Sequence, residues 1–316
     1  MADLSKLSVH EIRQQLGVGA LSLTPQLLGR LKRDPRQGVR QLYTTLKKRH
    51  DRERDEQARL DGMLNFERIL WKTGVTRIAG VDEAGMGPLA GPVVAAAVVF
   101  PPGTALDGVD DSKRLDHELR GVLAQAIRKS AAGIGIGTVE VGEIDRINIY
   151  QAGLLAMRRA VDALPERPEH VLVDARTIPD LDVAQNPFTK GDGINFSIAA
   201  ASIIAKTHRD ALMDDLDRLY PDYGFARHKG YGTPEHQDAI GRVGPCAVHR
   251  LSFGIIRELC GEYSGLFYEL RDRLVQAAAA TDLAAFDEML GARKADLGDD
   301  EHRKLKLMLS RRWKTI

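Results

Sequence analysis

The stretch "RIAGVDEAGMGPLAGPVV", residues 77–94, places two adjacent carboxylates, Asp82 and Glu83, between an apolar run and a glycine-rich turn. A carboxylate at the edge of a core is costly unless a cation compensates it, so the pair requires basic partners or a metal. Because adjacent strand residues point to opposite faces, both can serve one site only if the strand ends or bulges there, which Gly85 and Gly87 permit. The stretch therefore predicts a strand that brings negative charge to the edge of a sheet.

Other short apolar runs predict further strands of the same sheet. Their continuous Val, Ile and Ala content is typical of strands that are covered on both faces. Helical periodicity is present at 143–164 and at 197–219, where a patch of small residues, "AAAS", stands out. We therefore expect an α/β core with a mixed sheet flanked by helices. The runs are "RIAGVD" (77–82), "VVAAAVVF" (93–100), "GIGIGTVEV" (133–141) and "HVLVDA" (170–175).

The two ends of the chain read as helical extensions of this core. Leu27, Leu28 and Leu31 fall at helical spacing, and "DPR" at 34–36 breaks the pattern. After about residue 262 the sequence is rich in alanine and charge and again predicts helix, outside the core. The expected regions are a basic helical N-terminal extension (1–64), an α/β domain (65–262) and a helical C-terminal extension (263–316).

Charge is distributed unevenly along the 316 residues, although the net charge is only +1. Residues 1–60 contain 13 Lys and Arg against 7 Asp and Glu, which gives +6, whereas residues 61–260 contain 22 against 27, which gives −5. Basic ends on a mildly acidic core could be arms that bind nucleic acid. The alternative is a set of solvated charged helices.

Cysteine usage and hydropathy argue against several protein classes. The two cysteines, Cys246 and Cys260, lack a second pair, so a disulfide framework or a tetrahedral zinc site is not expected. The N-terminus has no apolar secretory core, and the apolar run at 93–100 is too short to span a bilayer. We expect a cytoplasmic protein with no membrane role.

Four acidic residues stand at the ends of predicted elements rather than on solvated helix faces. Besides Asp82 and Glu83, they are Asp174 after "VLV" and Asp192 in "FTKGDG". In open α/β sheets, ligands collect at strand ends, and clustered carboxylates are the usual way to hold Mg²⁺ or Mn²⁺ against a phosphate. For any single acid, a helix cap or an ion pair is the alternative.

The glycine loop, "GMGPLAG" at residues 85–91, carries less information on its own. Pro88 and the lack of a Gly-Lys-Ser/Thr sequence argue against a Walker-type phosphate loop. A tight turn is the simplest interpretation. Backbone N–H groups freed by such a turn could still bind a phosphate diester or a sugar hydroxyl.

Seven sequence blocks, in order across residues 78–256, resemble those of the ribonuclease HII family. A looser similarity extends into the N-terminal region, through "DPR" and "FERILWKTG". The blocks are "IAGVDEAGMGPLAGPVV" (78–94), "DSKRL" (111–115), "EIDRINIYQAGLLAMRRAV" (143–161), "VLVDA" (171–175), "KGDGINFSIAAASIIAK" (190–206), "YGFARHKGYGT" (223–233) and "HRLSF" (249–253).

The resemblance implies a ribonuclease H-like fold and an endonuclease that depends on Mg²⁺ or Mn²⁺. Its substrates would be the RNA strand of RNA/DNA hybrids and ribonucleotides embedded in duplex DNA. Two-metal-ion hydrolysis would leave 3′-hydroxyl and 5′-phosphate ends. The family's metal-binding acids map onto the same four residues that strand-end placement had indicated. We expect the protein to act as a monomer.

The resemblance also assigns substrate contacts. Recognition of RNA requires a group that senses the 2′-hydroxyl, and in the family a glycine loop and a tyrosine do this. They correspond to Gly85, Met86, Gly87 and Tyr231, while Ser112 and Lys113 resemble contacts to the phosphate backbone. His228 and Lys229, beside Tyr231, would be cations able to meet phosphate.

Two departures from the family pattern remove positive charge near the expected phosphate. Met86 stands where the family has Arg or Lys, and "GDGINFS" lacks the basic residue that the family has soon after "GD". These losses motivate a rival hypothesis, a non-cleaving nucleic-acid-binding protein that retains the fold. Retention of all four acids weighs against it, because binding alone does not require clustered carboxylates. A nucleotide-binding phosphotransferase is a third reading, which the missing phosphate-loop lysine disfavours.

Overall fold

The computed structural model describes residues 7–17, 23–260 and 263–313. The chain divides into two compact units, Met1–Met63 and Leu64–Ile316. The first unit contains helices α1 (Val9–Gly17), α2 (Pro25–Arg33) and α3 (Gln37–Met63). Ile12, Leu31 and Val39, one from each helix, are buried in its small core. The predicted break at 34–36 is confirmed, since it falls between α2 and α3.

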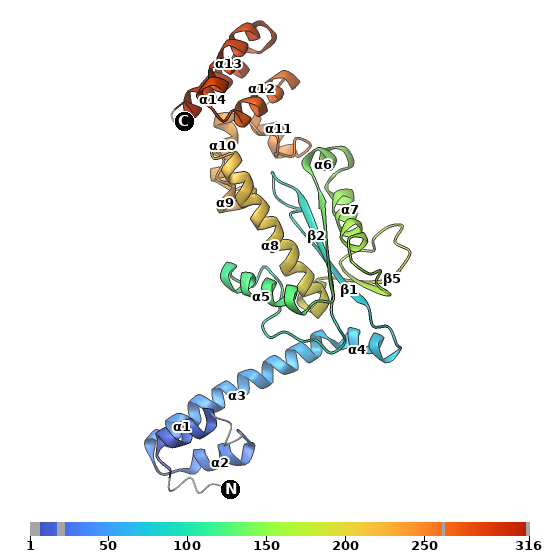
Figure 1. Ribbon diagram of the computed structural model, residues 1–316, viewed down its shortest axis with the longest axis vertical. Helices are drawn as coiled ribbons and strands as arrows, with labels where there is room; N and C mark the ends of the chain where they lie inside the picture. Colours follow the sequence, from blue (N-terminus) through green and yellow to red (C-terminus); the bar gives the residue numbers. More distant parts are fainter. Residues whose placement is uncertain (1–6, 18–22, 261–262, 314–316) are drawn as a thin grey trace. The chain divides into compact units, whose positions relative to one another are not determined.

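The second unit is built on a five-stranded mixed sheet with strand order β3-β2-β1-β4-β5 (Figure 1). Strand β2 pairs antiparallel with β1 and β3, whereas β4 pairs parallel with β1 and β5. The mixed sheet and four of its strands were predicted from the sequence, but β5 was not, because its sequence "AQNPF" is neither apolar nor alternating. The strands are β1 (Ile78–Ala84), β2 (Val93–Val99), β3 (Gly133–Val139), β4 (His170–Asp174) and β5 (Ala184–Phe188).

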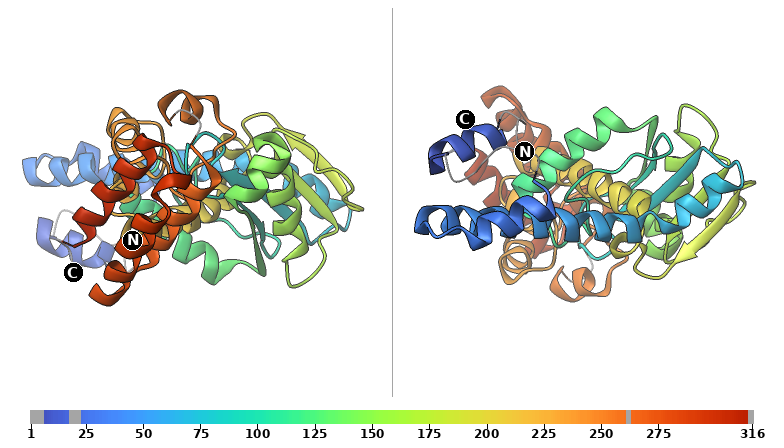
Figure 2. Two further views of the ribbon diagram at one scale, coloured as in Figure 1. Left: turned by 90° about the horizontal axis from the view of Figure 1, so that it is seen from above. Right: turned by 90° about the horizontal axis from the view of Figure 1, so that it is seen from below.

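Two long helices cover the opposite faces of this sheet (Figures 1 and 2). Helix α7 (Ile149–Asp162) packs on the face that includes Val81 and Val173. Helix α8 (Phe196–Leu219) packs on the other face, so closely that a Cβ added to Gly80 would lie 2.1 Å from the carbonyl carbon of Ser197. All seven residues of β2 are buried, as expected for a strand covered on both sides.

The helical pattern predicted at 143–164 is two helices, not one. Helix α6 (Val141–Ile147) ends at Asn148, whose φ of 68° is incompatible with continued helix, and α7 begins at the next residue. Asparagine tolerates the left-handed region, and its side chain caps α7 by accepting a hydrogen bond from the amide of Gln151 (3.1 Å). Periodicity could not show this break because the apolar face continues across it.

The remaining helices surround the sheet or follow it. A hydrophobic cluster joins the C-terminal helices to α8 and α10 through Met213, Ile240, Phe267, Leu283 and Leu305. The predicted boundary after residue 262 lies outside the described residues and stays a prediction. No helix in the described part of the chain has the length and apolar character needed to cross a bilayer. These elements are α4 (Asn65–Lys72), α5 (His117–Ser130), η2 (Gly191–Gly193), α9 (Phe225–His228), α10 (Pro234–Val243), α11 (Gly254–Cys260), α12 (Gly265–Gln276), α13 (Ala280–Ala292), η3 (Lys294–Asp296) and α14 (Asp299–Arg312).

Candidate active site

Three of the four predicted metal ligands come together at the ends of β1 and β4. Carboxylate oxygens of Asp82, Glu83 and Asp174 all lie within 4.8 Å of one another. The parallel pairing of β1 with β4 ends at Val81 and Val173, so Asp82 and Asp174 are the next residues on adjacent strands. Their proximity follows directly from strand register.

Glu83 reaches this group although it is adjacent to Asp82 in the strand. Pairing of β1 with β2 stays regular through Glu83 and Ala84, so no bulge turns the side chain. β1 itself continues to Ala84, one residue past the pair, and what ends before the pair is the pairing with β4, which stops at Val81. The Glu83 side chain is one methylene longer than that of Asp82, which helps it reach the shared site.

The electrostatics of the three acids fit a bound cation. Burial, followed by the charges of Glu83 and Asp174, raises the pKa of Asp82 well above its usual range. Burial and the charge of Asp174 raise the pKa of Glu83, although Arg176 and Lys113 partly oppose this. Oε2 of Glu83 is buried without a hydrogen-bond partner in the described part of the chain. An oxygen-only donor set with an unpartnered carboxylate oxygen suits Mg²⁺ or Mn²⁺.

Asp192, the fourth predicted ligand, lies nearby but outside this group of oxygens. Its Oδ2 accepts a hydrogen bond from Nζ of Lys113 at 3.1 Å, and the Asp192 side chain is buried. It remains close enough to the others that its charge contributes, after burial, to raising the pKa of Asp174. The amide of Gly191 donates to Oδ1 of Asp174 at 2.7 Å, so the turn bearing Asp192 is tied to the acidic cluster.

A buried glutamate from α4 fixes the start of α8 and with it the position of Asp192. Glu67 accepts hydrogen bonds from the amide (3.1 Å) and hydroxyl (2.8 Å) of Ser197 and from the Asn195 side chain (3.1 Å). Asn195 in turn caps α8 by accepting from the amide of Ile198. The "FERILWK" segment therefore has a structural part in the site.

Ser112 and Lys113, the predicted phosphate contacts, both adjoin the acidic residues. The Ser112 hydroxyl lies 2.7 Å from that of Ser202, which itself donates a hydrogen bond to Asp82. Because a hydroxyl has one proton, Ser112 must donate to Ser202. The Ser112 side chain thus supports Asp82, and its role as a phosphate contact stays a prediction. Lys113 is exposed apart from its ion pair with Asp192.

The glycine loop and Tyr231 lie side by side. A Cβ on Gly87 would lie 3.6 Å from Cε1 of Tyr231, whose side chain is 46% exposed. Gly85 has a φ of 95°, and a Cβ there would lie 2.1 Å from Nε of Arg209, so only glycine fits. The loop and an exposed aromatic ring therefore form one surface.

Met86 is only partly buried and packs against α7. A Cβ on Gly153 would lie 2.9 Å from the Met86 sulfur, so the absence of a side chain on Gly153 makes room for the thioether. The side chain also packs against the apolar cluster beneath the sheet's α7 face. The structure therefore gives Met86 a packing role in place of the charge that the family pattern would provide.

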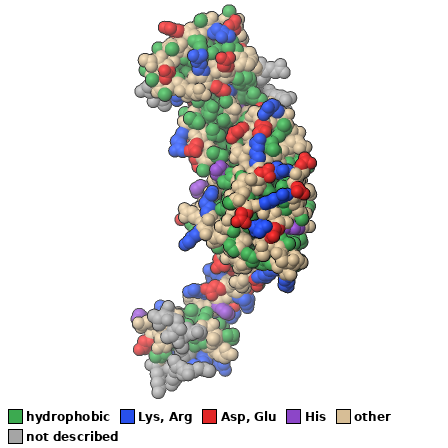
Figure 3. Space-filling view, turned by 45° about the vertical axis from the view of Figure 1, so that its right-hand side comes forward, with side chains coloured by type: hydrophobic (Ala, Val, Ile, Leu, Met, Phe, Trp, Pro, Cys, Tyr) green, Lys and Arg blue, Asp and Glu red, His purple; other side chains and the backbone are tan. Residues whose placement is uncertain are grey.

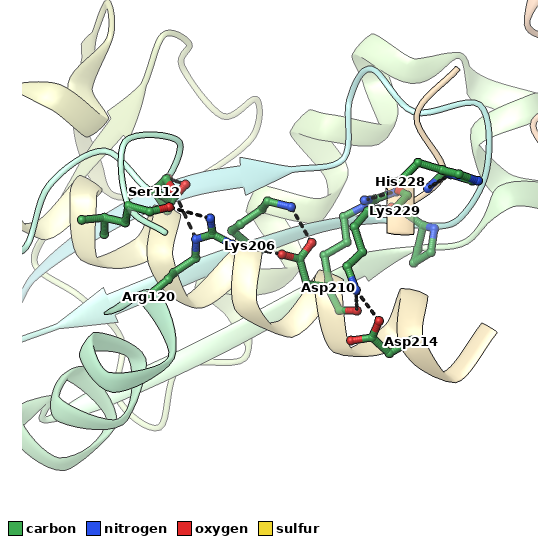
Figure 4. A network of polar contacts seen from close by, with 12 residues as sticks. Ser112, Arg120, Lys206, Asp210, Asp214, His228 and Lys229 are labelled. Carbon is green, nitrogen blue, oxygen red and sulfur yellow. Dashed lines mark hydrogen bonds and ion pairs between the residues drawn. The ribbon is translucent and has the colours of Figure 1, made fainter. Parts of the chain in front are cut away.

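The basic residues beside Tyr231 are less available than the sequence indicated. His228 is buried, its Nε2 lies 2.8 Å from the carbonyl oxygen of Tyr223, and its Nδ1 accepts from the amide of Gly230. Contrary to expectation, it is not a surface cation. Lys229 is ion-paired with Asp214 (Figure 4).

Sequence reasoning assigned no role to several residues that shape the site. Ser202 supports Asp82, Arg176 offsets the charge of Glu83, and two buried arginines, Arg209 and Arg250, hold the glycine loop. Figure 4 shows a further one, Arg120, which donates to the carbonyl oxygen of Ser112 (3.1 Å). The sequence signals were that Ser202 lies in the "KGDGINFSIAAASIIAK" block and Arg250 in the "HRLSF" block.

Comparison with known proteins shows the family to which the chain belongs. The sequence model of the family described as Ribonuclease HII matches residues 79–255, and that of the Ribonuclease HII N-terminal domain matches residues 8–71. The chain belongs to the ribonuclease HII family. The Ribonuclease HII of Anaeromyxobacter sp. (strain Fw109-5) is 50% identical over 259 residues, which cover 82% of each protein. That of Geobacillus thermodenitrificans (strain NG80-2) is 50% identical over 250 residues, 77% of this chain and 96% of the relative.

Among solved structures, the ribonuclease H2 from Pyrococcus horikoshii OT3 is 25% identical and aligns with a TM-score of 0.49, over 58% of this chain and 96% of that chain. Membership in the ribonuclease HII family confirms the predicted fold class and supports ribonuclease H activity. The alternative of a non-cleaving nucleic-acid-binding protein is not favoured. The family's enzymes use divalent metals, and the acidic cluster could bind one.

Proposed function

We propose that this protein cuts the RNA strand of RNA/DNA hybrids and also cuts at single ribonucleotides embedded in duplex DNA. The products carry 3′-hydroxyl and 5′-phosphate ends. The proposal includes the three regions expected from the sequence (1–64, 65–262 and 263–316) and a monomer acting in the cytoplasm. The observation that carries it is the convergence of three carboxylates, two of them on β1, the strand that leads directly into the glycine loop, whose Gly87 lies against Tyr231.

Asp82, Glu83, Asp174 and Asp192 are the residues proposed to hold Mg²⁺ or Mn²⁺. The first three already share one site, and the unpartnered Oε2 of Glu83 supports a ligand there. A bound divalent cation supplies positive charge for activating water and for stabilising the departing 3′ oxygen. Asp192 is held in an ion pair by Lys113, which donates to its Oδ2. We expect this ion pair to open when the fourth ligand is needed.

The chain's own residues provide the selection for RNA. Tyr231 offers an exposed ring on which a sugar can stack, and the glycine loop beside it brings backbone N–H groups close to the 2′-hydroxyl. Lys113 is an exposed cation that pairs with Asp192, and it can meet a phosphate once it leaves that residue. Recognition of one sugar thus occurs next to the carboxylates that act on its phosphate.

The test compares three labelled duplexes of one sequence: all-DNA, DNA with a single ribonucleotide, and a continuous RNA/DNA hybrid. We expect cleavage of the two that contain ribonucleotides, only with Mg²⁺ or Mn²⁺, and none of the all-DNA duplex. Asp174→Asn should abolish cleavage, whereas Asp162→Asn, at an exposed ion pair with Arg158, should not. Cleavage of the all-DNA duplex at a similar rate, or metal-independent cleavage, would show that the proposal is wrong.

A further inference from the structure

The guanidinium of Arg250 binds four of the seven carbonyl oxygens of the glycine loop. Its guanidinium is fully buried and makes five hydrogen bonds to main-chain oxygens, with no side-chain acceptor among them. The acceptors are Gly85 O (2.6 Å), Met86 O (3.2 Å), Pro88 O (2.8 Å) and Gly91 O (2.8 and 3.0 Å).

Arg209, from α8, links the glycine loop to the segment that carries Tyr231. It donates to the carbonyl oxygens of Ala90 and Pro92 on one side and of Lys229 on the other, each at 3.0 Å. Residues 228–233 are called the tyrosine turn below. The amide of Leu89 also donates to Gly230 O at 2.8 Å, so the turn and the loop are fixed to each other twice.

The inward carbonyls determine where the amides point. In a trans peptide the C=O of one residue and the N–H of the next point in opposite directions. Because Arg250 binds the oxygens of Gly85 and Met86, the N–H groups of Met86 and Gly87 point away from it. Neither of these amides donates to an acceptor in the described part of the protein. Gly87 adjoins the Tyr231 ring, so free donors lie beside the exposed aromatic surface.

The two arginines also bring positive charge to the loop. No carboxylate of the described residues lies within 4.0 Å of either guanidinium, and carbonyl oxygens alone solvate them. Burial, and next the charge of Arg209, lowers the pKa of Arg250 to about 9, which leaves it cationic at neutral pH. This charge lies behind a loop whose own side chain at position 86 is uncharged.

We propose that Arg209 and Arg250 are positioning residues for ribonucleotide recognition, which orient the loop amides outward and hold them at a fixed distance from Tyr231. The inference deepens the proposed function, since it rests on recognition of the 2′-hydroxyl at this surface. Arg209 sets the spacing between loop and turn, and Arg250 sets the direction of the loop peptides. Neither needs to touch the substrate.

The test measures binding rather than cleavage, in the absence of divalent metal. Fluorescence anisotropy gives the affinity of the full chain for a duplex with one ribonucleotide and for the all-DNA duplex, and the ratio of the two is the readout. We expect Arg209→Lys and Arg250→Lys each to lower this ratio roughly tenfold, the effect of about one lost hydrogen bond. Arg271→Lys is the matched control, because Arg271 is equally buried but pairs with Asp272.

A double variant separates positioning from general destabilisation. If Arg209 acts by placing the loop against Tyr231, then Arg209→Lys should cause little further loss in a Tyr231→Ala background. The inference is overturned if the losses in affinity ratio multiply in the double variant, or if Arg271→Lys lowers the ratio equally. A wild-type ratio in folded Arg209→Lys and Arg250→Lys would also overturn it. If circular dichroism shows Arg209→Lys to be unfolded, Arg250→Lys alone decides. A wild-type protein with no preference for the ribonucleotide duplex also overturns it, whereas the cleavage assay judges the proposed function separately.

Discussion

Asp82, Glu83 and Asp174 repel one another in the absence of a cation. Each is at least partly buried, and burial together with the neighbouring negative charge raises the pKa values of Asp82 and Glu83. Such a group costs stability unless a ligand compensates it. The cost is consistent with a site selected for binding a metal rather than for folding.

Asp174→Asn should separate the repulsion among the acids from the stabilisation by a bound metal. Without metal, we expect the melting temperature to stay the same or rise by about 2 °C, because one repulsive charge is removed. Added Mg²⁺ or Mn²⁺ should stabilise the wild type but stabilise the variant much less, since a ligand is lost. Differential scanning fluorimetry across metal concentration measures both. Equal metal-induced shifts in the two proteins would show that Asp174 is not a ligand.

Met86→Arg tests the side chain that departs from the family pattern. An arginine at this position can leave the packing against Gly153 and meet a phosphate, with a gain of about 1.5–3 kcal/mol for a charge-assisted contact. Cleavage at a single embedded ribonucleotide should therefore rise more than cleavage of a long hybrid, because a long hybrid offers many other phosphate contacts. Met86→Gln, of similar length but neutral, controls for the lost packing. If both substitutions give the same result, charge is not the cause.

At the scale of elements, the tyrosine turn rests on a chain of buried neutral histidines. Nδ1 of His236 lies 2.9 Å from Tyr231 O, and because a carbonyl only accepts, Nδ1 carries the proton. Nε2 of His236 then accepts from Nε2 of His249 (3.0 Å), whose Nδ1 accepts from the amide of Cys246 (2.8 Å). This pattern of donors and acceptors is possible only if the rings of His236 and His249 are both uncharged.

This arrangement predicts a loss of stability as pH falls. Burial lowers the pKa of His236 to about 4 from 6.5, so between these values the unfolded state binds a proton that the folded state does not. The free energy of unfolding should therefore decrease from pH 6.5 toward pH 4, by up to about 1.4 kcal/mol per pH unit for each such histidine.

The acidic cluster gains stability as pH falls, which opposes the loss from the histidines. The pH dependence of stability must therefore be compared between variants. Urea unfolding at pH 7 and pH 5 should show a smaller loss for His236→Gln than for the wild type. His10→Gln, at an exposed histidine of α1, is the matched control. If His236→Gln loses as much unfolding free energy between pH 7 and pH 5 as the wild type does, this ring is not held neutral by burial.

At the scale of the whole molecule, the N-terminal unit carries some cations that form ion pairs and others that do not. On the face drawn in Figure 3, basic and acidic side chains are interspersed rather than separated by sign. Many cations of α3 are paired one turn away, such as Lys47 with Asp51 and Arg49 with Glu53. The exposed Lys and Arg side chains of this unit that make no ion pair with a described residue are those of Arg13, Lys32, Arg33, Arg40, Lys48 and Arg52.

Removing residues 1–63 should weaken binding to the hybrid and reduce its dependence on salt, because cations that displace counterions from the nucleic acid are lost. Replacing these six cations by Gln in the full chain should reproduce most of this change. Replacing Lys47 and Arg49, which are paired, should have a smaller effect. The measurement is the slope of log affinity against log salt. If the truncation leaves the slope unchanged, the unit is a set of solvated helices and not an arm.

The sequence by itself determined the parts of this protein that depend on local pattern. Continuous apolar runs predicted β1 to β4, and periodicity predicted α8, because burial on one or two faces leaves a direct record in residue order. The position of the acids at strand ends also followed, since parallel strands bring their carboxyl ends to one edge. That Asp82 meets Asp174 was decided by the parallel register of β1 with β4, which the structure supplies. For the roles of these acids, the sequence and the family give predictions that await the experiments above.

Only the tertiary structure decided which polar groups meet across long separations. Lys113 pairs with Asp192, 79 residues away, and Arg250 binds the carbonyl oxygen of Gly85, 165 residues away. Apart from its place in the "HRLSF" block, nothing in the residue order distinguishes Arg250 from an exposed arginine, because its partners are main-chain oxygens, which every residue has. The orientation of the glycine loop, the burial of His228 and the packing of Met86 belong to the same class. They depend on which surfaces the folded chain brings together, and a local pattern carries no record of that.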